Sequence, residues 1–176
     1  YPATLFVDDT PPSNDDRRWW VLHTRPRQEK SLARQLHASA VPFYLPLIPN
    51  TIYSRGRKVT SFLPLFGGYA FIYVDPAERV TALTTNRIVH TLEVDNQPRF
   101  WSDIKQLEKL IASGAPITPH DKLAPGDTVI IRSGPLAGLE GTILQTATGN
   151  RFVVKIDFIQ KGASVLINDY HLDIPL

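Results

Sequence analysis

Helical patterning ends near residue 114 and does not return, and this change constrains the fold more than any other feature of the sequence. Before it, strand-like apolar runs alternate with segments in which apolar residues recur at helical spacing. After it, short β-branched runs are separated by glycine-containing turns, a pattern typical of a small all-β barrel. We therefore predict an α+β protein with an α/β sandwich at residues 17–113, a linker at 114–124 and an all-β domain at 125–176.

The first predicted domain begins with the compact strand WWVLH at residues 19–23 and continues into a helix near Pro26. A long β-hairpin follows and turns at the basic residues RGRK, 55–58. The strand GGYAFIYV, residues 67–74, lacks alternation, which predicts a central position and burial on both faces of a mainly antiparallel sheet. Asp75 is the expected N-cap of the short helix after it.

Both ends of this domain carry local signals. Residues 1–16 contain three prolines and four aspartates, and they predict a flexible tail that cannot bury enough apolar surface to become ordered. At the other end, Ser102 is the expected N-cap of a helix whose apolar stripe runs to the stop signal Gly114.

Composition excludes several classes of protein. The chain has no cysteine, so it has neither disulfides nor thiolate metal sites, and its five histidines are not at metal-ligand spacing. No apolar run approaches the roughly 20 residues that span a bilayer. Without a phosphate-binding loop, a nucleophile motif or paired carboxylates, we expect a cytoplasmic protein that is not an enzyme and has no metal, no cofactor and no membrane contact.

Charge is distributed unevenly along the chain. Between Arg17 and Lys58 there are nine Lys or Arg residues and one acid, Glu29, although the net charge of the whole chain is only +2. A basic half joined to an acidic half suggests a surface for a polyanion. The alternative is that these basic side chains only solvate a helix face and a hairpin tip.

A glycine-rich hairpin, GDTVIIRSGPLAGLEGTI, occupies residues 126–143. Gly134 and Gly138 suit a turn that needs positive φ, and Gly141 lies in the returning strand, where the absence of Cβ permits a close backbone approach. Taken alone, this pattern also fits a generic tight β-turn.

The whole pattern resembles one family. PGDTVIIRSGPLAGLEGTI is similar to the KOW motif, which implies an SH3-like barrel, and WWVLHTRPRQEK with FLPLFGGYAFIYV is similar to the N-terminal (NGN) domain of the NusG transcription elongation factors. The resemblance implies a monomeric factor, of the specialised RfaH or UpxY type, that binds core RNA polymerase and modulates pausing, termination or antitermination. It also implies that the KOW domain recruits other factors, for which a ribosomal protein, Rho or neither of these remain open.

The same resemblance places the polymerase contact in the segment PLFGGYAF. It assigns the clamp contact to Phe66, Tyr69 and Phe71, since buried aromatic side chains supply much of an interface's binding energy. The alternative is that these rings are core residues, above all Phe71. A gate-loop contact falls to Arg79 and Thr81, although the chain reads AERVTA where RfaH-like paralogues carry a histidine and threonines.

The DNA contacts implied by the resemblance are arginines and one lysine. Arginines near a helix start can hold phosphates or stack on splayed bases, and a basic hairpin tip can contact the phosphates of duplex DNA. For the non-template strand the candidates are Arg25, Arg27, Arg34 and Arg87, and for upstream DNA they are Arg55, Arg57 and Lys58. Solvation is the alternative for each of them taken singly.

Two other functions remain open from the sequence. KOW domains also occur in ribosomal proteins, so a ribosome-associated RNA-binding protein is the main alternative, although such proteins are usually more basic. A two-domain hydrolase of unknown type is the other.

Overall fold

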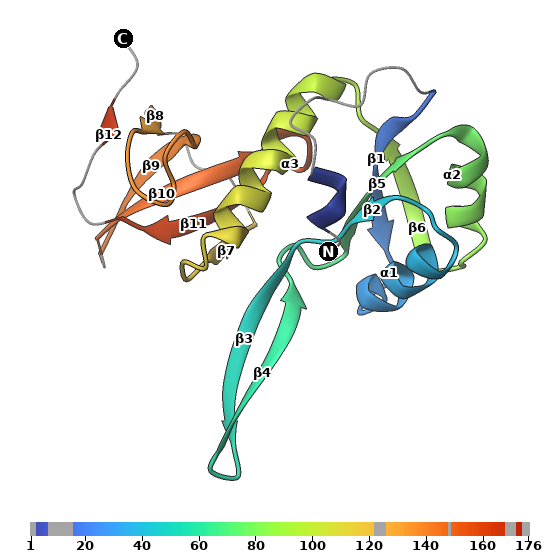
Figure 1. Cartoon of the computed structure of the whole chain (residues 1–176), viewed down its shortest axis with the longest axis horizontal. Coiled ribbons are helices and arrows are strands. Elements are labelled where there is room, and N and C mark those ends of the chain that lie inside the picture. The colour runs from blue at the N-terminus through green and yellow to red at the C-terminus, as the bar shows by residue number, and fades with distance from the viewer. Residues whose placement is uncertain (1–2, 7–15, 122–125, 148, 168–171, 174–176) are drawn as a thin grey trace. The chain divides into compact units, whose positions relative to one another are not determined.

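The computed structural model of the chain describes residues 3–6, 16–121, 126–147, 149–167 and 172–173 (Figure 1). It divides into two compact units, Tyr1–Pro98 and Arg99–Leu176, which we describe separately. Most of the predicted tail at 1–16 lies outside the described residues, and the predicted domain limits stay predictions. The structure confirms the predicted α+β class, with helices and an antiparallel sheet in the first unit and an all-β sheet in the second.

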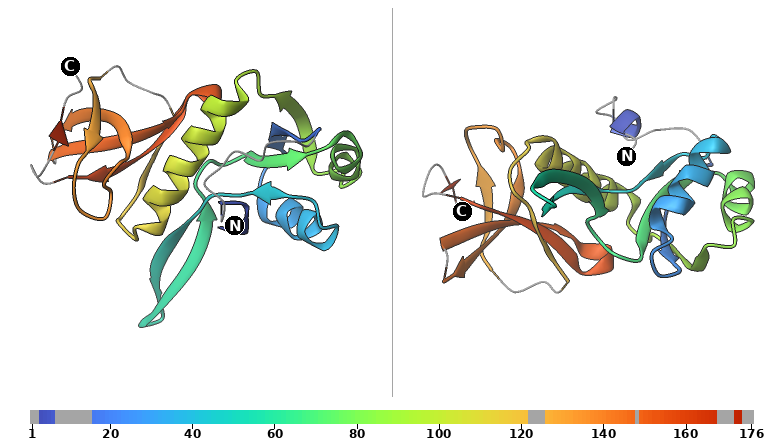
Figure 2. Two further views of the ribbon diagram at one scale, coloured as in Figure 1. Left: turned by 45° about the horizontal axis from the view of Figure 1, so that its top comes forward. Right: turned by 90° about the horizontal axis from the view of Figure 1, so that it is seen from below.

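The N-terminal unit is built on a four-stranded antiparallel sheet with the order β2-β5-β1-β6. A separate two-stranded ribbon, β3-β4, projects away from this sheet (Figure 1, and Figure 2, left). The elements are η1 Ala3–Phe6, β1 Arg18–Thr24, α1 Glu29–Ala38, β2 Phe43–Tyr44, β3 Leu47–Ser54, β4 Arg57–Pro64, β5 Tyr69–Val74, α2 Pro76–Leu83 and β6 Ile88–Glu93.

The core of this unit lies between the sheet and its helices. Alternate residues of β1 and β5, such as Leu22 and Ile72, pack with Leu32 and Leu36 of α1 in one fully buried cluster. The opposite face of the same strands is also buried, as Phe71 shows. The interior position of β5, between β2 and β1, confirms the expectation from its unbroken apolar run.

Helix α2 begins as its sequence predicts. Asp75 accepts a hydrogen bond from Glu78 N (2.8 Å), and the Glu78 carboxylate accepts one from Asp75 N (3.0 Å), which together form a capping box. Arg17 adds a two-pronged ion pair to the same carboxylate, with N–O distances of 2.8 and 3.0 Å. The first basic residue of the chain is therefore paired within its own unit.

Two helix starts differ from the sequence expectation. Helix α1 begins at Glu29 rather than near Pro26, because Arg27 adopts a left-handed φ of 61° that interrupts the turn. Helix α3 begins at Gln97, so Ser102 lies inside it and is not its cap. The Gln97 side chain accepts from Trp19 N (2.6 Å) and donates to Trp19 O (3.0 Å), which ties this helix start to β1.

The C-terminal unit holds most of α3 and a six-stranded antiparallel sheet in the order β12-β8-β9-β10-β11-β7. Thr118–His120, within the expected linker, forms strand β7 beside β11. The elements are α3 Gln97–Ala112, β7 Thr118–His120, β8 Thr128–Ile131, β9 Glu140–Thr146, β10 Gly149–Ile156, η2 Asp157–Ile159, β11 Lys161–Leu166 and β12 Leu172–Asp173.

Glycines shape the β8–β9 hairpin of this sheet. Gly134 and Gly138 have φ values of +85° and +83°, which other residues adopt only with strain. A Cβ on Gly141 would clash with the carbonyl oxygen of Val153 and would lie 2.7 Å from Phe152 Cζ. Only glycine therefore lets β9 approach β10 this closely.

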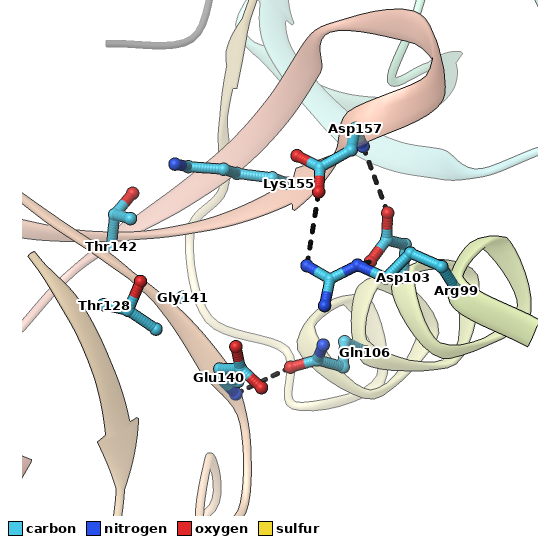
Figure 3. Close-up of a pocket in the computed structure, with 9 residues that line it drawn as sticks. All are labelled: Arg99, Asp103, Gln106, Thr128, Glu140, Gly141, Thr142, Lys155 and Asp157. Atoms are coloured by element: carbon cyan, nitrogen blue, oxygen red, sulfur yellow. Dashed lines mark hydrogen bonds and ion pairs between the residues drawn. The ribbon is translucent and has the colours of Figure 1, made fainter. Parts of the chain in front are cut away.

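Polar contacts join α3 to the sheet in the C-terminal unit (Figure 3). Asp157 N donates to Asp103 Oδ2 (3.1 Å), and Arg99 bridges the carboxylates of Asp103 (3.2 Å) and Asp157 (3.3 Å). Glu140 N donates to the side-chain oxygen of Gln106 (2.6 Å). These residues line a pocket of about 190 Å³ in which most of the charges face an opposite charge.

Asp103 is an unusual member of this set, because it is a carboxyl group with only 2% exposure. Burial raises its pKa from 3.8 to about 6, and the hydrogen bond from Asp157 and the charge of Arg99 oppose this shift only in part. The Asp157 and Glu140 carboxylates raise the pKa further.

We expect Gly141→Ala to destabilise the C-terminal unit by about 1–3 kcal/mol, because the added Cβ overpacks the contact with β10. Thermal or denaturant unfolding of the full chain measures this loss. Gly67→Ala is the matched control, since a Cβ there meets no atom within 4 Å. Equal stability of the Gly141 variant and the wild type would contradict the close approach.

The raised pKa of Asp103 predicts a pH-dependent stability. The folded state binds a proton that the unfolded state releases at lower pH, so this contribution is complete below about pH 4 and is lost as pH rises to about 6. Asp103→Asn keeps an acceptor for Asp157 N but cannot ionise. Urea titrations at several pH values should therefore show a weaker fall in unfolding free energy for this variant, whereas an identical slope would refute the shift.

Candidate functional site

Three segments that are distant in sequence meet at one end of the N-terminal sheet. β1 ends where its antiparallel neighbours β5 and β6 begin. Thr24 N donates to Gly68 O (2.8 Å), and Arg25 N donates to Arg87 O (2.9 Å). The segment before α1, the turn before β5 and the residue before β6 are therefore adjacent, and they contain many of the site residues predicted from the sequence.

A buried carboxylate fixes the turn before β5. Glu29, which is 8% exposed at the start of α1, accepts a hydrogen bond from Gly68 N (2.7 Å). Gly68 has φ +81°, and Tyr69 N donates to Phe66 O (3.1 Å) to close the turn. The sequence offered one signal for Glu29, its position as the single acid of the basic half, but did not indicate this role.

The three aromatic residues assigned to the polymerase contact differ in exposure. Phe66 is 2% exposed and Phe71 is fully buried, so neither ring is available at the surface of this conformation. Tyr69 is half-buried, and its ring lies 5.4 Å from that of His23, which in turn stacks on His90 at 6.1 Å. These last three side chains form a row across β5, β1 and β6.

The arginines expected to face DNA gather around the start of α1. The guanidinium of Arg87 donates to Gln35 on α1 (2.9 Å) and to Gln28, the residue before that helix, so two amides hold it in place. Arg34 donates to Ser31 on its own helix (3.0 Å). These amides were not among the residues singled out from the sequence, because the contact depends on pairing between β1 and β6. The exposed Arg25 and Arg27 lie in the segment before α1.

Arg79 and Thr81 lie on α2, away from this sheet end. The Arg79 guanidinium lies 4.0 Å above the Trp20 ring and donates to Thr91 (3.0 Å). Its Nε is buried without a hydrogen-bond partner among the described residues. A pocket of about 240 Å³ is lined by Arg79 together with Trp20 and Glu93. Thr81, in contrast, is exposed and donates a hydrogen bond within its own helix.

The basic hairpin tip lies apart from these residues. Arg55 and Gly56 form a two-residue turn with φ values of 50° and 74°, and Arg57 and Lys58 begin β4. All three basic side chains are exposed. Within the described part of the chain, they make no hydrogen bond or ion pair.

Metal sites and membrane-spanning helices are not found among the described residues. In the described ranges, no group of three His, Asp or Glu side chains could hold a metal ion. Likewise, none of the helices among these residues is long and apolar enough to cross a membrane. The expected KOW turn glycines lie in the β8–β9 hairpin, where they shape the backbone and present no side chain.

Comparison with known proteins identifies the family. The family model "Transcription termination factor nusG" matches residues 17–109. The structure described as "Domain interaction in Thermotoga maritima NusG" is similar in fold, with a TM-score of 0.50 and 16% identity over 91% of this chain and 98% of that chain. The MjSpt4:Spt5 complex aligns at a TM-score of 0.29 and 13% identity over 89% and 97%. Because the family model covers more than half of the length of this chain, the chain belongs to the NusG family of transcription factors.

Proposed function

We propose that the protein is an elongation factor that binds core RNA polymerase through its N-terminal domain and modulates pausing, termination or antitermination. It acts in the cytoplasm as a monomer and without catalysis. The observation that carries this proposal is the family match. The matched residues, 17–109, include all the side chains that meet at the end of the N-terminal sheet.

Tyr69 is the aromatic residue best suited to the polymerase contact. Its half-buried ring has a surface that a partner can cover, and Glu29 holds the turn that presents it. Phe66 precedes it by three residues but is 2% exposed, so its contact requires that turn to open on binding. Phe71 is fully buried two residues further along the same strand, so its contact also requires a rearrangement on binding.

The cluster of arginines beside this turn is assigned to the non-template DNA strand. Arg25 and Arg87 come from adjacent strand ends, and the amides of Gln28 and Gln35 orient the Arg87 guanidinium. A guanidinium held in this way loses less freedom when it binds a phosphate. Arg27 and Arg34 extend the same basic surface.

Further contacts complete the proposal. The hairpin tip carries Arg55, Arg57 and Lys58 toward the phosphates of upstream DNA. Arg79 and Thr81 face the gate loop of the polymerase, with Arg79 stacked on Trp20. The C-terminal KOW domain recruits a ribosomal protein or Rho.

The mechanism is a shift between two states of the polymerase. A factor that binds the closed-clamp state more tightly than the paused state favours elongation without making or breaking a bond. The size of that shift is limited by the difference between the two affinities. The direction of the effect at a terminator then depends on the partner of the KOW domain.

We expect Tyr69→Ala to weaken binding to core RNA polymerase by about 1–3 kcal/mol, because it removes a ring at the centre of the proposed contact. Biolayer interferometry with core enzyme lacking nucleic acid measures the loss. Tyr69→Phe retains the ring and should bind within about twofold of the wild type. Phe66→Ala is expected to weaken binding as well, but it also opens a cavity in the fold, so Tyr69 is the sharper test.

The outcome for Tyr53→Ala serves as a further control. Tyr53 is 79% exposed on the hairpin. Its replacement by alanine should leave binding to the nucleic-acid-free enzyme unchanged. If Tyr69→Ala also binds normally, the aromatic contact has been assigned to the wrong residue.

Charge reversal tests the DNA contact. Arg25→Glu with Arg87→Glu should reduce crosslinking to the non-template strand and lower the salt dependence of binding to an elongation complex, because two phosphate contacts are lost. Arg132→Glu is the control for one reversed charge, half of the change in the double variant, on an exposed side chain of the C-terminal unit. Crosslinking that stays at the wild-type level in the double variant would argue against this surface.

A further inference from the structure

The β3–β4 ribbon has an unusual surface for a segment that belongs to neither of the two larger sheets. Its eight cross-strand pairs run from Leu47↔Pro64 to Ser54↔Arg57. Two of its aromatic side chains are largely exposed, Tyr53 at 79% and Phe62 at 54%. Strand propensity favours such residues in a ribbon, but it does not account for aromatic rings left open to water.

The register places both aromatic residues on one face. Tyr53 pairs with Lys58, Thr51 with Thr60, and Pro49 with Phe62, and alternate pairs share a face. The hydroxyl groups of Thr51 and Thr60 lie 3.0 Å apart and mark the middle of this face. We call it the aromatic face. The intervening pairs, such as Ile52↔Val59, lie on the other side of the ribbon.

Charge indicates the nature of the partner. Residues 47–64 contain three basic side chains, Arg55, Arg57 and Lys58, and no acid. Lys58 lies directly across from Tyr53, so a cation and an exposed ring occupy the same pair of positions. A partner that matches this face must carry negative charge. It must also have flat apolar surfaces at the spacing of the two aromatic residues.

We infer that the aromatic face binds single-stranded nucleic acid, with bases stacked on Tyr53 and Phe62 and a phosphate beside Lys58. Base stacking on aromatic side chains beside a basic groove is how proteins hold single strands without reading their sequence. A duplex keeps its bases stacked on one another, so it would offer phosphates to the tip but no base to the rings. This inference builds on the proposed function, which gives the tip a phosphate contact only.

The dimensions of the ribbon agree with this occupant. Phe62 lies opposite Pro49, four positions along β3 from Tyr53. The two backbone positions are therefore about 14 Å apart along the ribbon. An extended strand with splayed bases can reach both rings while its phosphates pass Lys58.

The test measures binding of the full chain to oligonucleotides in the absence of polymerase. Fluorescence anisotropy uses labelled oligothymidylate and oligouridylate of about twelve nucleotides, long enough to cover the ribbon, at several salt concentrations. Tyr53→Ala should weaken binding roughly tenfold and leave the salt slope unchanged, because a ring is lost but no charge. Tyr53→Phe should bind like the wild type.

Two matched variants separate stacking from other causes. Lys58→Gln should weaken binding and lower the salt slope by about 0.7, the value of one phosphate contact to a single strand. Ile52→Ala changes the neighbouring residue on the opposite face and should have no effect. Tighter binding of either oligonucleotide supports the inference and identifies the strand, DNA or RNA, that the face prefers.

Three results would overturn the inference. They are unchanged affinity of Tyr53→Ala, an equal loss in Ile52→Ala, and equally tight binding of a duplex of the same length. Each is independent of the polymerase contact, because no polymerase is present. A failed result with Tyr69→Ala would thus remove the proposed clamp contact and leave this test unaffected.

Discussion

The antiparallel pairing of β1 with both β5 and β6 determines which segments meet at one end of the N-terminal sheet. Because both neighbours run opposite to β1, the residue that follows β1 meets the residues that precede them. Arg25, Gly68 and Arg87 become neighbours through backbone hydrogen bonds at this one end of the sheet. Glu29 then secures the arrangement, since its buried carboxylate joins the start of α1 to the turn before β5. A polar surface and an aromatic turn are thus placed side by side by strand direction and by the Glu29 hydrogen bond.

Local patterns predicted much of the fold. The unbroken apolar run before Asp75 indicated an interior strand, and the Asp-Pro pair that follows it indicated the helix start; the structure has both. The resemblance to the NusG family, which was based on two motifs in order, is confirmed by the family match. One of the two wrong helix starts arose where a distant contact decides the local structure. Gln97 begins α3 by bonding to the backbone of Trp19, and no spacing rule reveals such a partner.

The candidate site was harder to predict from the sequence than the fold was. Residue types suggested the arginines as candidates, but the two amides that orient Arg87 lie far from it in the chain, and only strand pairing brings them together. The exposure of each aromatic side chain was equally hard to predict from sequence. Phe66 and Tyr69 have similar sequence contexts, and yet only Tyr69 reaches the surface. Such differences depend on packing from several elements at once, which a single sequence does not encode in any local pattern. The assigned contacts therefore stay predictions, whereas the family is established.

Among the described residues, no third strand joins the sheet of β3 and β4, so two strand edges of this ribbon are open. Unpaired N–H and C=O groups along an edge can pair with any extended chain, and proteins usually block them with proline or charge. Here Pro49 and Pro64 interrupt the base of the ribbon, and the cationic tip repels another copy of itself. The stretch between them, residues 50–53 and 59–63, contains neither proline nor charge. Self-association of this protein at high concentration would accordingly begin by strand addition along the middle of the ribbon.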